Sequence, residues 1–172
     1  MLTYMGLPDD AQDVRAAKLK ALKAAYNTSD ATAFAMLPAT ALSKQNAARG
    51  DKLVVNSHGN AGVFAGYTPD QFMEQLTSKG FEEGAFPAVY LMACMVGIQA
   101  QDNSIYDNFA RDLKRLFVGH GITAKLYAPR GLLSYTVADK QVSGQTVKEV
   151  TDIFIRTPER NYPLSEGVLL VM

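Results

Sequence analysis

Apolar residues are grouped along this chain in two ways, as short continuous runs and as longer stretches with helical spacing. The runs 53–57 and 88–92 are apolar almost throughout and follow Gly50 and Pro87. Runs of this length, bounded by turn residues, predict strands that are buried on both faces. Weaker signals predict further strands over 2–6, 33–37, 122–127, 132–137 and 167–172. The pattern over 146–156 fits neither a helix nor a strand clearly, so this segment is left unassigned.

The first stretch with helical spacing is predicted to begin at a cap formed by Asp9 or Asp10 and to end near Asn27. One side of this helix is apolar, and the other side carries basic residues: Arg15, Lys18, Lys20 and Lys23. We interpret the basic side as a solvated face rather than as a membrane or partner site, because the charged side of an amphipathic surface helix normally faces water.

Two further helices have recognisable start signals. In the first, Thr68 can cap, Pro69 suits the first helical position and Gln71 completes a capping box. The second is predicted to open at Ser104 and to stop at Gly119. Its apolar residues are Ile105, Phe109, Leu113 and Leu116.

The order strand, helix, strand, helix, strand predicts an α/β fold with a doubly wound, mostly parallel sheet and helices on both of its faces. We find no internal repeat, low-complexity tract or Pro/Gly-rich linker in the sequence. Residues 1–172 are therefore expected to form a single α/β domain, a size at which about 70 % of the surface of the unfolded chain becomes buried.

The composition and charge of the chain argue against some classes of function. Hydrophobic residues make up 48 % of the chain and charged residues 20 %, and seventeen basic residues balance seventeen acidic ones. This balance argues against nucleic acid and membrane partners. The single cysteine cannot form an internal disulfide. The first residues lack the basic and apolar regions of a signal peptide, so the expected location is cytoplasmic, or exported without a cleavable signal.

Two residues that could take part in catalysis follow the two strands with the clearest sequence signals. The first strand runs into Ser57-His58-Gly59 and the second into Ala93-Cys94. Because one helix separates the two strands, a right-handed crossover makes them neighbours or near neighbours, and chemistry in such sheets gathers at the carboxyl ends of the strands. A thiolate is a strong nucleophile, and an imidazole can take its proton and return it to a leaving amine. Each residue alone has a simpler interpretation, as an inert core cysteine or a satisfied polar histidine, and the combination favours a catalytic pair.

An apolar strand ending in His-Gly, followed by another ending in Ala-Cys, resembles clan CD of the cysteine peptidases, which includes caspases, legumains, gingipains, clostripain and the self-processing domains of large bacterial toxins. The resemblance covers about residues 50–130. It implies a caspase-like fold, with Cys94 as nucleophile, His58 as its proton-transfer partner, and the backbone amides of Gly59 and Cys94 as the oxyanion hole. It also implies a substrate pocket formed partly by the segment 128–134, where Arg130 and Ser134 are the candidate substrate-binding residues.

The resemblance therefore implies a cysteine endopeptidase that acts on a protein or peptide, such as a bacterial effector or a processing protease, without a metal or organic cofactor. The balanced charge disfavours the toxin domains, which need a strongly basic inositol phosphate site. Two rival interpretations stay open: a deamidase or acyl transferase that uses the same pair, and a non-catalytic binding module on the same fold. The sequence does not predict the oligomeric state or the preferred side chain at the cleavage site.

Other motifs are set aside. The segment 119–124 matches the spacing of a dinucleotide fingerprint, but it follows a helix and enters a strand, which is the reverse of the required order. The second histidine, His120, lies at the predicted end of a helix, where a His-Gly pair is usually structural. Two histidines and one cysteine far apart in the sequence show no zinc-ligand spacing.

Overall fold

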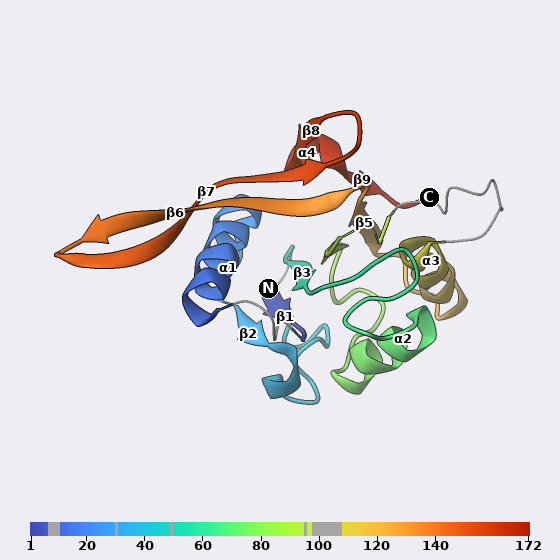
Figure 1. The fold of residues 1–172 in the computed structure, drawn as a ribbon. Helices are drawn as coiled ribbons and strands as arrows, with labels where there is room; N and C mark the ends of the chain where they lie inside the picture. Colours follow the sequence, from blue (N-terminus) through green and yellow to red (C-terminus); the bar gives the residue numbers. More distant parts are fainter. Residues whose placement is uncertain (7–10, 30, 49, 95, 98–107) are drawn as a thin grey trace.

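A six-stranded sheet forms the centre of the fold in the computed structural model, which describes residues 1–6, 11–29, 31–48, 50–94, 96–97 and 108–172 (Figure 1). The strand order is β2-β1-β3-β4-β5-β9. The strands comprise β1 (Leu2–Tyr4), β2 (Thr32–Ala33), β3 (Lys52–Asn56), β4 (Ala88–Met92), β5 (Lys125–Pro129) and β9 (Val168–Leu170). The first five are parallel, and β9 runs antiparallel to β5 at the edge. The prediction of an α/β fold with a mostly parallel sheet is confirmed.

Helices cover both faces of the sheet, as the sequence predicted. Helix α1 (Gln12–Tyr26) lies on one face, and α2 (Pro69–Ser78) and α3 (Phe109–Gly119) lie on the other (Figure 1). Strand β3 shows why both faces are apolar: Leu53 and Val55 belong to the core on the α2 and α3 side, whereas Val54 belongs to the core on the α1 side. The period of two along a strand sends successive side chains to opposite faces.

The start of α2 follows its predicted capping box. The Thr68 hydroxyl accepts a hydrogen bond from the Gln71 amide at 3.4 Å, and the Gln71 side chain accepts one from the Thr68 amide at 3.0 Å. Pro69 occupies the first helical position. The apolar side of α2 is buried, with Phe72, Met73 and Leu76 at most 3 % exposed. Because all of these signals are local, they could be identified without knowledge of the fold.

Phe72 also belongs to a cluster of three aromatic rings between α2 and α3. The ring centroid of Phe64 lies 4.9 Å from that of Phe72 and 5.7 Å from that of Phe109. Phe64 precedes α2 in the loop that follows β3, and two isolated bridges pair it with Gly59 and with Tyr67. The cluster therefore joins the His58 loop to both helices on this face.

The starts of α1 and α3 differ from the prediction. Helix α1 begins at Gln12 with Ala11 in the N-cap position, where no side chain accepts a capping hydrogen bond. The predicted caps, Asp9 and Asp10, lie outside the described residues. Helix α3 begins later than predicted, at Phe109, because the side chain of Asn108 accepts a hydrogen bond from the Arg111 amide at 2.8 Å and so caps the helix. The predicted start, Ser104 and Ile105, also lies outside the described residues.

Two predicted strands are partly wrong. The segment 33–37 is a strand only at its start, because β2 ends at Ala33 and a 3₁₀ helix, η1 (Phe34–Met36), follows. Phe34 and Leu37, three residues apart, are both buried, and a 3₁₀ turn achieves this by placing them on one side. The segment 122–127 contributes only its second half to β5, since the Ile122 amide instead donates to Phe117 O at 2.8 Å and closes the end of α3.

A long antiparallel hairpin projects from the sheet region on the α1 side (Figure 1). It consists of β6 (Leu132–Val142) and β7 (Gln145–Arg156), and the short strand β8 (Asn161–Pro163) extends it to a three-stranded sheet followed by α4 (Leu164–Gly167). Ser143 and Gly144 both have positive φ angles, 51° and 79°, as a two-residue hairpin turn requires. The hairpin resolves the ambiguous segment 146–156 as strand and makes the predicted strand 132–137 almost twice as long.

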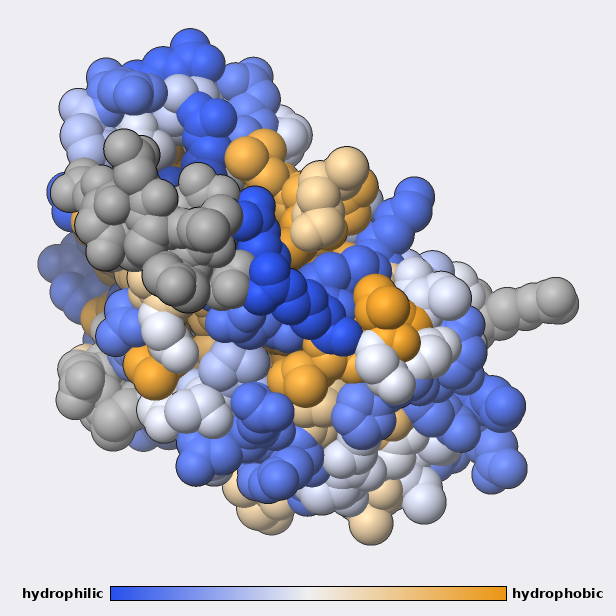
Figure 2. Space-filling view, turned by 90° about the vertical axis from the view of Figure 1, so that its right-hand side faces the viewer, coloured by the Kyte–Doolittle hydropathy of each residue, from blue (hydrophilic) through white to orange (hydrophobic). Residues whose placement is uncertain are grey.

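On the face drawn in Figure 2, apolar side chains lie in small groups among polar ones. Exposed apolar residues include Val118 of α3, at 68 %, and Leu169 and Leu170 of β9, at 44 % each. Scattered exposure of this kind is normal for a globular protein. Among the described residues, no helix has the length and apolar character to cross a bilayer.

Candidate functional site

His58 and Cys94 follow the carboxyl ends of two strands that pair directly. Strands β3 and β4 are parallel neighbours, and their last residues, Asn56 and Met92, are in register. Two hydrogen bonds continue the pairing beyond the strands, from the Asn56 side chain and the Ser57 amide to Met92 O, at 2.7 and 3.2 Å. His58 and Cys94 each stand two residues past the paired ends, so both leave the sheet at the same level.

A small cavity of about 70 Å³ lies at this level, and both residues line it. Its walls come from α1, β3 and the loop after it, the turn after β4, and β6: Lys18, Asn56, Ser57, His58, Cys94, Leu133 and Tyr135. The His58 side chain is exposed, and Cys94 is partly buried. This cavity is far smaller than the roughly 300–1,000 Å³ of typical ligand pockets, so it suits a small chemical group.

The thiol of Cys94 has an environment that favours its protonated form. It donates a hydrogen bond to Leu133 O at an Sγ–O distance of 3.7 Å. Burial raises the pKa of the Cys94 thiol above its usual value, and the positive charges of Lys18 and Arg156 oppose this effect without reversing it. The resting cysteine is therefore a thiol, and a nearby base has to remove its proton before it can act as a nucleophile.

Lys18 also belongs to this site, although the sequence predicted that it lies on a solvated face of the helix. It is half-buried, its Nζ lies 5.1 Å from the centroid of the Tyr135 ring, and both residues line the cavity. The correction has a physical cause: the hairpin of β6 and β7 packs on α1 and covers part of its basic side. No local signal in the sequence of α1 indicates which lysine the hairpin will cover.

Gly59 is held close to the loop that follows β4. A Cβ atom at this position would lie 2.8 Å from Val96 Cγ1, closer than real side chains come, and 3.1 Å from Ala93 Cβ, which is a tight contact. The glycine therefore allows the His58 loop to approach the Cys94 turn. Among the hydrogen bonds between described residues, neither the Gly59 amide nor the Cys94 amide serves as a donor.

The two candidate substrate-binding residues, Arg130 and Ser134, are not among the described residues that line this cavity. The Arg130 guanidinium stacks on Tyr162, 3.6 Å from the ring centroid, and the Arg130 amide donates to Gly167 O at 2.9 Å. The Ser134 hydroxyl donates to Leu132 O at 3.1 Å. Within β6, alternation along the strand turns Leu133 and Tyr135 toward the cavity and Ser134 away from it.

The described part of the chain contains no group of three or more His, Cys, Asp or Glu residues arranged to hold a metal ion. Met95 and residues 98–107, next to Cys94 in the sequence, lie outside the described residues. A comparison with protein-family models found no matching family, and a search of the curated proteins found no matching relative.

Proposed function

We propose that this protein is a cysteine endopeptidase with a caspase-like fold of the clan CD type, and that Cys94 and His58 form its catalytic dyad. One observation carries the proposal: the two residues follow directly paired strands and line the same cavity. A sulfur nucleophile and a group able to accept its proton are the two parts that thiol-dependent acyl transfer needs. The cavity suits a reacting carbonyl group better than a whole side chain, which would bind outside it.

The proposed reaction has two stages. His58 removes the proton from the Cys94 thiol, the resulting thiolate attacks the scissile carbonyl carbon, and the carbonyl oxygen becomes an oxyanion. The backbone amides of Gly59 and Cys94 are the proposed donors to that oxyanion. The C–N bond then breaks, the leaving amine takes the proton from His58, and a thioester remains on Cys94. Water, deprotonated by His58, hydrolyses the thioester, releases the acid and restores the thiol.

A mixed peptide library tests this proposal. The native protein is expected to generate new peptide termini at a limited set of sites, and Cys94→Ala is expected to generate none, because no other group in the site can form the thioester. Mass spectrometry of both digests measures the outcome. Identical peptide profiles from the two proteins would end the peptidase proposal, and glutamine converted to glutamate without backbone cleavage would identify a deamidase instead.

One observation favours a second candidate, a binding module in which Cys94 is inert. The thiol is partly buried, donates to a backbone carbonyl, and has a pKa that burial raises. Alkylation by iodoacetamide at neutral pH distinguishes the two. An activated dyad is expected to label severalfold faster in the native protein than in His58→Ala, because the imidazole assists loss of the proton. An inert cysteine is expected to label equally slowly in both proteins.

A further inference from the structure

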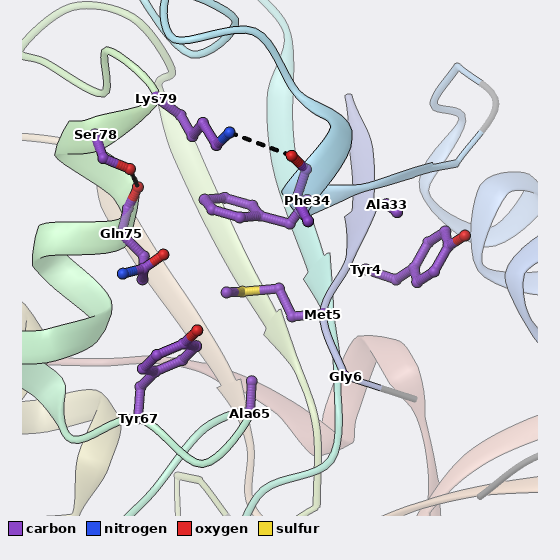
Figure 3. Close-up of a pocket in the computed structure, with 11 residues that line it drawn as sticks. Tyr4, Met5, Gly6, Ala33, Phe34, Ala65, Tyr67, Gln75, Ser78 and Lys79 are labelled. Atoms are coloured by element: carbon purple, nitrogen blue, oxygen red, sulfur yellow. Dashed lines mark hydrogen bonds between the residues drawn. The ribbon is translucent and has the colours of Figure 1, made fainter. Parts of the chain in front are cut away.

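A second and larger cavity lies beside β1, away from Cys94. Its volume is about 370 Å³, within the range of small-molecule sites. Four parts of the chain supply its lining residues, as Figure 3 shows: the end of β1, the segment 33–35, the loop after β3, and the C-terminal half of α2. It shares no described lining residue with the cavity at Cys94.

The cavity occupies a place where α/β sheets commonly bind ligands. The chain crosses from β1 to β2 in one direction and from β3 to β4 in the other, so the strand order reverses between β1 and β3. Ligands in open α/β sheets bind outside the carboxyl ends of the strands at such a switch point. Met5 and Gly6, which directly follow β1, line the cavity.

The interior of this cavity is suited to a flat apolar group. In Figure 3 the Met5 side chain lies between the rings of Phe34 and Tyr67, and Ala65 lies beside it. A methionine thioether adapts to the shape of its neighbours and makes favourable contacts with aromatic rings. The wall opposite β1 is held in position, because the Ala65 amide donates to His58 O at 2.8 Å.

The rim carries a fixed positive charge. Lys79 Nζ donates to Leu37 O at 2.6 Å and approaches Ala35 O at 3.5 Å, so its ammonium group stays at the cavity (Figure 3). Two carbonyl partners use two of its three N–H donors, and the third is left for a ligand. Among the described lining residues, Lys79 is the one with a charged side chain. A ligand of complementary chemistry therefore carries an anionic group at one end.

We propose that this cavity is a binding site for a small aromatic carboxylate. The aromatic ring of the ligand packs against the Met5 side chain and the Tyr67 ring, and the carboxylate accepts a hydrogen bond from Lys79. The Gln75 side chain, which also comes from α2, lines the cavity between Lys79 and Tyr67 and supplies a second polar group (Figure 3). The site is separate from the proposed peptidase dyad, so the one can exist without the other.

Titration with 2-naphthoate, followed by NMR of the protein labelled with ¹³C at its methionine methyl groups, tests the proposal. The Met5 methyl resonance, assigned by its loss in Met5→Leu, is expected to shift along a saturable curve. The resonance of Met172, which is 91 % exposed, is expected to stay in place. The cation 2-naphthylmethylammonium has a similar ring and the opposite charge, and it is expected to bind at least tenfold more weakly. Equal responses to the two compounds, or an unchanged Met5 resonance, would overturn the proposal.

Two variants locate the binding. Ala35→Phe places a ring at the exposed edge of the cavity and is expected to abolish the Met5 shift. Lys79→Met keeps the aliphatic stem, removes the charge and is expected to weaken binding about tenfold, whereas Lys125→Met on β5 is expected to change nothing. If Lys79→Met fails to fold, Ala35→Phe decides the question. Cys94→Ala is expected to bind 2-naphthoate as the native protein does, so failure of the peptidase proposal leaves this result unaffected.

Discussion

Replacement of Phe64 by alanine is expected to lower the free energy of unfolding by about 3–5 kcal/mol, the range typical of a fully buried phenylalanine. Phe64 is 0 % exposed, and its ring contacts those of Phe72 and Phe109. Truncation to alanine removes these contacts and leaves a cavity that three separate segments would have to close. Urea denaturation, followed by circular dichroism and analysed by linear extrapolation, measures the loss.

The matched control is Val118→Ala on α3, an apolar truncation at a site that is 68 % exposed. It is expected to change the free energy of unfolding by no more than about 0.5 kcal/mol. A loss below about 1 kcal/mol for Phe64→Ala would contradict the packing described for the aromatic cluster. Phe64 also forms an isolated β-bridge with Gly59. The fraction of Phe64→Ala that remains folded is therefore expected to lose order in the His58 loop as well.

The elements that could be predicted from the sequence are those with local signals. The capping box at Thr68 and Gln71 needs only four consecutive residues, and it fixed the start of α2 correctly. The runs that became β3 and β4 are apolar because both of their faces are covered, and this property is visible in any continuous apolar segment. The one intervening helix predicted that the strands would be neighbours or near neighbours; they pair directly, and His58 and Cys94 line one cavity.

The parts that could not be predicted depend on contacts between distant segments. Apolar and polar residues alternate only weakly along the two strands of the long hairpin, because most of its length is exposed. Its position over α1 is set by packing rather than by its own sequence. For that reason Lys18 and Tyr135, which the hairpin brings together at the site, were missed. The partner of Arg130 could not be predicted either, because Tyr162, on whose ring it stacks, lies 32 residues further along the chain.

If Cys94 and His58 form the proposed dyad, replacement of His58 by alanine is expected to lower kcat/KM for peptide cleavage by about 10²- to 10⁴-fold at pH 7, the usual contribution of a general base. The reason is the protonation state of Cys94, the proposed nucleophile. Burial raises the pKa of the Cys94 thiol, so at neutral pH almost none of the cysteine ionises without assistance. Cleavage of a fluorogenic peptide, chosen from the sites found with the library, measures the rate.

The pH dependence of the residual rate distinguishes loss of a base from loss of structure. In His58→Ala the thiolate forms only by direct ionisation, so the residual rate is expected to rise with pH through the alkaline range, above the usual pKa of a thiol. The native rate is expected to rise less steeply over the same range, because His58 assists the loss of the thiol proton. His120→Ala replaces an exposed histidine at the end of α3 and is expected to keep native activity. A residual rate in His58→Ala that stays flat with pH would mean that His58 does not act on the proton of Cys94.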